Sequence, residues 1–243
     1  MLSDKNWRTE SAMLLMLTIM TNYLFVMLVA SLIFKFSHAD GSIKPGALIF
    51  SATTLAFHCA NLFFVAAFLR INRTNWSEAF GISQSPGWHV LGFAALATAV
   101  VLPLAWLLGE ASAQILSWLN VAAAEQLPVQ TLRATVSIPQ KIIFGSAAIV
   151  VAPVGEELLF RGLAYPMLKQ WGFRRFAWWG PSIFFATMHQ NLQVFASLVM
   201  LALLLTWLYE KTGTLLVPIL THSLFNAVNF FWLLHERAPA FPS

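Results

Sequence analysis

Charged residues are scarce in this chain, and their scarcity sets its class. Asp, Glu, Lys and Arg make up 10% of the 243 residues, whereas 58% are hydrophobic and the mean hydropathy is +0.71. A soluble globular domain has about 25% charged residues, so the composition excludes that class and indicates a polytopic membrane protein. The formal net charge is +4, yet no cluster of Lys and Arg exceeds a pair. This pattern suits basic loops beside anionic lipid and argues against a nucleic-acid partner.

Cysteine and aspartate are scarcer still. Cys59 is the single cysteine and lies in an apolar run, so the chain cannot form an internal disulfide. The only aspartates, Asp4 and Asp40, lie outside the apolar runs or at their edges, which excludes an aspartyl dyad within a membrane. A zinc-binding HExxH and a GxSG serine motif are also lacking, because the His-Glu pair at 235–236 continues as Arg-Ala-Pro and the Gly-Ser pair at 145–146 as Ala-Ala. Among the catalytic acids used inside membranes, these absences leave glutamate.

Long apolar runs, in contrast, are plentiful. Seven runs are candidates to cross about 30 Å of hydrocarbon, at residues 11–34, 46–69, 88–109, 141–168, 176–190, 191–209 and 214–234. Residues 110–140 mix polar and apolar side chains and contain Pro128 and Pro139. We expect a helix along the membrane surface there, with an eighth span as the alternative. The sequence therefore predicts an all-α polytopic membrane protein with seven to eight transmembrane helices.

One apolar run carries three charges. Between Pro153 and Gly162 stand Glu156, Glu157 and Arg161, and each would cost about 2.5–3.5 kcal/mol if it faced lipid unpaired. On a helix, Glu157 and Arg161 are spaced i, i+4 and can neutralise one another. Glu156 is turned about 100° from its neighbour and has no local cation. It must face another helix or a wet cavity, which makes it a candidate functional residue.

Two further segments place polar groups on one helical face. Phe185 and His189 are spaced i, i+4, and so are His222 and Asn226. The rise of about 1.5 Å per helical residue gives the depth of each group below a basic residue at the membrane surface. These depths are about 20 Å for Glu156 from Lys169, about 22 Å for His189 from Arg174, and about 16 Å for His222 from Lys211. The sequence thus predicts a polar cavity within the membrane. A carboxylate and an imidazole there could activate water, and an imidazole and an amide could donate hydrogen bonds to an oxyanion.

These motifs resemble those of the CPBP family, also called ABI, of CAAX-processing and bacteriocin-processing glutamic intramembrane endopeptidases. The family patterns EExxxR, FxxxH and HxxxN stand here as EELLFR at 156–161, FATMH at 185–189 and HSLFN at 222–226. The resemblance covers roughly residues 140–235. It implies an intramembrane protease that needs no cofactor or metal and cleaves peptides or proteins, prenylated CAAX proteins being the family's best-known substrates.

The resemblance also assigns roles to residues. Glu156 would be the general base, His189 would help to activate the water, and His222 with Asn226 would form the oxyanion hole. Glu157 and Arg161 would be a structural ion pair, and Phe185 would support the site.

The apolar runs, the basic residues and the resemblance together suggest an organisation and a location. Residues 1–139 would be N-terminal transmembrane helices with an amphipathic connecting segment, 140–235 the catalytic core, and 236–243 a short C-terminal tail. We expect an integral protein of a prokaryotic cell (inner) membrane. Its basic loop 169–175 would face the cytoplasm, and the site would open to that side.

Two alternatives remain open from the sequence. Glu156, His189 and His222 could ligate a divalent metal in a metal-dependent hydrolase. The polar layer could also belong to a transporter or to a non-catalytic scaffold or immunity protein. A separate group, His58, Cys59 and Asn61, has the residue types of a metal site, but we interpret it as packing polarity because no second set of ligands is evident.

Overall fold

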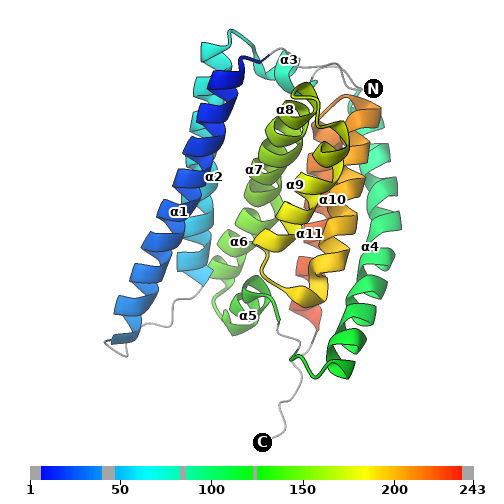
Figure 1. Ribbon diagram of the computed structural model, residues 1–243. Helices are drawn as coiled ribbons and strands as arrows, with labels where there is room; N and C mark the ends of the chain where they lie inside the picture. Colours follow the sequence, from blue (N-terminus) through cyan, green and yellow to red (C-terminus); the bar gives the residue numbers. More distant parts are fainter. Residues whose placement is uncertain (1–6, 40–46, 83–85, 123–124, 237–243) are drawn as a thin grey trace, which may run out of the picture.

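The computed structural model describes residues 7–39, 47–82, 86–122 and 125–236, and every regular element in these ranges is helical (Figure 1). In chain order the helices are α1 (Thr9–Ala39), α2 (Ala47–Ile71), α3 (Trp76–Phe80), α4 (Gly87–Trp118), α5 (Leu127–Ala134), α6 (Ile138–Ser146), η1 (Ala147–Val151), α7 (Ala152–Glu157), η2 (Leu158–Ala164), α8 (Tyr165–Gln170), α9 (Arg174–Met188), α10 (Leu192–Thr212) and α11 (Leu216–His235). The elements η1 and η2 are π-helical turns within the continuous helical stretch from α6 to α8.

Six helical stretches have the length and apolar composition needed to cross a membrane. They are 9–33, 49–71, 87–118, 138–170, 192–212 and 216–235, found among the described residues. The predicted run 176–190 corresponds to α9, whose 15 residues span about 22 Å, short of the 30 Å or so of a hydrocarbon core. The chain is an all-helical integral membrane protein, but the predicted count of seven to eight spans is not confirmed.

The segment 110–140 differs from its prediction. The third apolar run does not end at residue 109, because α4 continues to Trp118 through residues that mostly favour helix, such as Glu110 and Gln114. Only the eight-residue α5 stands apart as a short helix, and its Arg133 pairs with Glu125 and Glu236. Within the described part of this segment no helix is long enough for an eighth span. The predicted tail 236–243 lies outside the described residues except for Glu236.

Two helix groups flank the stretch from α6 to α8 (Figure 1). On one side α1 packs along α2, and Trp7 anchors the start of α1 by an edge-to-face contact with Phe68. On the other side α10 packs between α4 and α9, with small residues such as Ala97 and Ala202 fully or nearly buried. Small side chains let membrane helices approach closely. The Ser197 hydroxyl of α10 accordingly donates to the Ala105 carbonyl of α4 at 2.7 Å.

Candidate active site

The stretch that carries the two glutamates is wound irregularly. η1 and η2 lie on either side of α7, so Glu156 and Glu157 occupy the last positions of α7 between two π-helical turns. Pro153 contributes to this winding because proline has no backbone N–H. In η1, the Ala152 N–H donates to the Ala147 carbonyl, five residues back, and residue 153 has no N–H to offer to Ala148. π-Helical turns within α-helices are frequent at functional sites.

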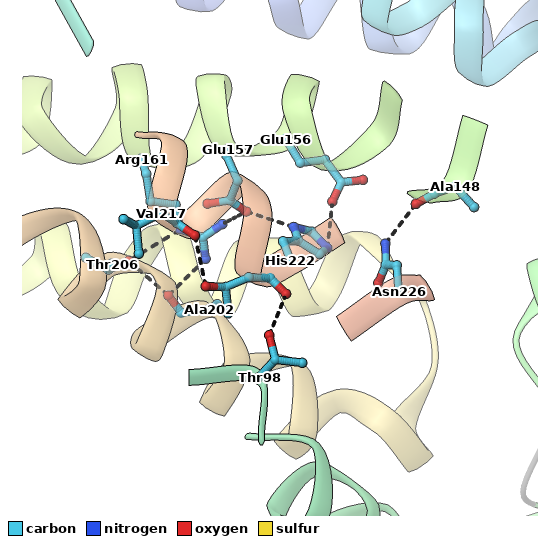
Figure 2. A network of polar contacts seen from close by, with 11 residues as sticks. Thr98, Ala148, Glu156, Glu157, Arg161, Ala202, Thr206, Val217, His222 and Asn226 are labelled. Atoms are coloured by element: carbon cyan, nitrogen blue, oxygen red, sulfur yellow. Dashed lines mark hydrogen bonds and ion pairs between the residues drawn. The ribbon is translucent and has the colours of Figure 1, made fainter. Parts of the chain in front are cut away.

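The carbonyl freed in this way receives a side chain from another helix. Asn226 of α11 donates its Nδ2–H to the Ala148 carbonyl at 2.9 Å (Figure 2). This contact joins the HxxxN motif to the irregular turn before the glutamates. An amide group has two N–H donors, so one donor of Asn226 remains for another partner.

Glu157 lies at the centre of a buried charge network. Its carboxylate accepts from Arg161 at 2.9 Å and from Nδ1 of His222 at 2.9 Å, and its side chain is 0% exposed (Figure 2). Arg161 also donates to the Ala202 carbonyl at 2.9 Å and makes a longer contact of 3.4 Å with the Thr206 hydroxyl. The ion pair between Glu157 and Arg161 is therefore present, and further contacts fix the arginine. Thr206 and the Ala202 carbonyl could not be predicted as partners from the sequence, because only the fold brings α10 to this arginine.

Glu156 is placed differently from its neighbour. Its side chain is 23% exposed, and Oε2 lies 3.8 Å from Nε2 of His222. His222 thus has a carboxylate on either side, with Glu157 at Nδ1 and Glu156 at Nε2 (Figure 2). Because a carboxylate only accepts, Nδ1 of His222 carries a proton.

His189 lies at the C-terminal end of α9. Its Nδ1–H donates to the Phe185 carbonyl at 2.8 Å, and since a carbonyl only accepts, Nε2 is the nitrogen that can take up a proton in the neutral ring. The Phe185 ring lies 4.8 Å from the His189 ring, 5.7 Å from the His222 ring and 5.1 Å from the Arg161 guanidinium. The first residue of the FxxxH motif therefore packs against both imidazoles.

A cavity of about 390 Å³ lies beside these groups, and both Glu156 and His189 line it. The expected cavity was polar, but this one is mainly apolar. Of its 17 lining residues, only Glu156, His189 and Tyr23 carry polar side-chain groups. Glu157, His222 and Asn226 are not among its lining residues. Glu157 and His222 pair with each other, and Asn226 pairs with the Ala148 carbonyl. The remaining walls come mainly from α1, η2 and α9.

The metal alternative gains no support from this arrangement. Among the residues that the structure describes, no three side chains of His, Cys, Asp or Glu come close enough together to hold a metal ion.

Residues 138–228 match the family model described as type II CAAX prenyl endopeptidase Rce1-like. The match contains all three motifs and runs from α6 into α11, leaving α1 to α5 outside. Neither the comparison with curated proteins nor the comparison with solved structures gave a match.

Proposed function

From the match of residues 138–228 to the Rce1-like family model, we propose that this chain belongs to the CPBP family and is a glutamic intramembrane endopeptidase. The observation that carries the proposal is the contrast between the two glutamates. Glu157 is hydrogen-bonded to Arg161 and His222, whereas Glu156 lines the cavity that His189 also lines. A partly exposed carboxylate next to an imidazole is the arrangement that general-base catalysis needs.

In the proposed reaction, Glu156 takes a proton from a water molecule while Nε2 of His189 accepts a hydrogen bond from the same water. The resulting hydroxide attacks the peptide carbonyl beside Glu156. Nε2 of His222, which lies 3.8 Å from the Glu156 carboxylate, and the second N–H of Asn226 would donate to the oxyanion. The proton held by Glu156 then passes to the leaving amine, which breaks the C–N bond. Every proton is accounted for without a metal.

The oxyanion hole sets a condition on His222. Its Nδ1–H already donates to Glu157, so donation from Nε2 to an oxyanion requires a proton on both ring nitrogens. Before Glu156 takes a proton from water, the two glutamates then carry two negative charges. Arg161 and the doubly protonated His222 carry two positive charges. The buried cluster is then electrically neutral, which limits the cost of burying it.

The proposed substrate is a peptide or protein held at the membrane. The family description names CAAX prenyl proteins, and an apolar cavity beside Glu156 suits a lipidated or apolar segment. We propose that the site opens to the cytoplasm, because the basic loop 169–175 joins α8 to α9 at one end of the bundle (Figure 1). The prokaryotic inner membrane remains our proposal for the location.

A comparison of peptide termini in membrane proteomes tests this function. Cells that carry the wild type should contain protein termini that are absent from cells carrying Glu156→Ala at equal expression. Glu110→Ala is the matched control, because Glu110 is an exposed glutamate of α4 away from the site. Identical sets of termini in wild-type and Glu156→Ala cells would instead favour the non-catalytic scaffold or transporter.

A further inference from the structure

A third histidine lies against the segment that carries Glu156. His58 of α2 belongs to none of the three motifs, and the sequence alone favoured a packing role for it. Its side chain is 3% exposed. A Cβ atom built on Gly155 would lie 2.0 Å from Nδ1 of His58, a distance that no side chain could tolerate. Glycine at 155 therefore allows the imidazole to rest on the backbone directly before Glu156.

The buried nitrogen of this ring is unsatisfied. Within the described part of the chain, Nδ1 of His58 has no hydrogen-bond partner, although buried polar groups nearly always have one. The neighbouring residue, Phe57, lines the cavity together with Glu156. The Glu156 carboxylate is also close enough to His58 to interact with it electrostatically. An unpaired donor is thus buried beside the proposed base.

We propose that His58 is a positioning residue for Glu156, whose carboxylate accepts a hydrogen bond relayed from the His58 Nδ1–H by one water molecule. This inference rests on the proposed function only in taking Glu156 as the base. A water that joins two buried polar groups is almost as effective as a direct hydrogen bond. The carboxylate would then lie between His58 of α2 and His222 of α11, which keeps it turned toward the cavity.

Other charged groups also act on Glu156, so losing His58 should weaken the site rather than abolish it. Glu157 and Arg161 belong to the same helical stretch, His222 approaches from α11 at 3.8 Å, and His189 faces the same cavity from α9. These groups are unchanged in a His58 variant. A change in the titration of Glu156 can therefore be attributed to His58.

Infrared titration of the full-length protein in lipid nanodiscs tests the proposal without a substrate. The protonated carboxyl band of Glu156 is assigned by its absence in Glu156→Gln. His58→Leu should raise the pH midpoint at which this band appears by about one unit, or about tenfold in proton affinity. His58→Asn should restore the midpoint, because the amide nitrogen of Asn occupies roughly the position of Nδ1 and can donate a hydrogen bond.

A purely structural role would give a different result. It would leave the midpoint unchanged in His58→Leu, or shift it equally in His58→Asn, and either outcome overturns the proposal. If His58→Leu does not fold, His58→Phe decides the matter in the same way, since it keeps an aromatic ring and removes the ring nitrogens.

Cleavage of a farnesylated CAAX peptide by the same variants is a separate readout. A Glu156→Gln enzyme as active as wild type would refute the proposed function, while the infrared midpoint would still decide the role of His58. If both proposals hold, His58→Leu lowers kcat severalfold with little change in KM.

Discussion

At the scale of single residues, two adjacent glutamates have opposite environments. Glu157 is fully buried and bonded to two cationic or potentially cationic groups, whereas Glu156 is partly exposed to a cavity. The i, i+4 spacing was enough to anticipate the partner of Glu157. The position of Glu156 beside His222 depends on packing between helices. From the sequence we could predict only that the motifs meet at a similar depth, not which side chains are neighbours.

Removing the charge of Glu157 should destabilise the protein. Glu157→Gln leaves the Arg161 guanidinium buried without a counter-charge, and we expect a loss of about 3–5 kcal/mol in the free energy of unfolding. Equilibrium unfolding in mixed detergent micelles measures this loss. Glu236→Gln is the control, because its ion pair with Arg133 involves a carboxylate side chain that is 46% exposed and should contribute less than about 1 kcal/mol. Equal losses in the two variants would contradict the account.

At the scale of the helical elements, the stretch from α6 to α8 contains irregular turns that the sequence pattern does not predict. Its length and apolar character were predicted from the run 141–168, but the two π-helical turns were not. A periodicity of 3.6 residues over so long a run does not reveal one extra residue in a turn. Pro153 was the available signal, since a proline inside a helix leaves carbonyl groups without their usual donors.

The link between Pro153 and Asn226 can be measured. Asn226→Ala leaves the Ala148 carbonyl without its side-chain donor, which should cost about 1–3 kcal/mol of stability. Pro153→Ala supplies a backbone N–H that can replace this donor. In a double-mutant cycle, the cost of Asn226→Ala should fall by at least about 0.5 kcal/mol in the Pro153→Ala background. Strict additivity of the two effects would mean that the π-helical turn does not depend on this pairing.

α9 shows a second limit of the sequence at this scale. Its apolar run was counted as a span, yet the helix has 15 residues and ends at Met188, just before His189. Hydropathy marks a segment as buried, but it does not separate a helix covered by protein from one that crosses lipid. Ser182, Phe185 and Ala186 of α9 are buried, whereas Trp179 and Phe184 are exposed, so only one face of this helix packs against its neighbours.

At the scale of the whole molecule, the arrangement of helices decides which side chains surround the proposed catalytic groups. The sequence predicted the class of fold and the convergence of three motifs, but it also predicted a polar cavity. The cavity is instead walled by apolar residues from α1, η2 and α9. The sequence could not have indicated this, because the pairing of Glu157 with His222 and of Asn226 with Ala148 depends on how α11 packs against the α6–α8 stretch.

Filling this cavity should impair binding of an apolar substrate segment. Met20 of α1 lines the cavity, and Met20→Trp should raise KM for a farnesylated CAAX peptide about tenfold while leaving the unfolding transition unchanged. The same substitution at Leu24, which is 63% exposed on α1 and does not line the cavity, is the control. Unaltered kinetics in Met20→Trp would show that the substrate does not occupy the cavity.

The most direct test of the central claim is a cleavage assay with purified protein in lipid nanodiscs. The rate of release of the C-terminal tripeptide from a farnesylated CAAX peptide is compared between wild type and Glu156→Gln. Removal of the general base should lower kcat by about 10²–10⁴-fold while both proteins unfold at the same temperature. Release of the tripeptide by Glu156→Gln at the wild-type rate would contradict the mechanism.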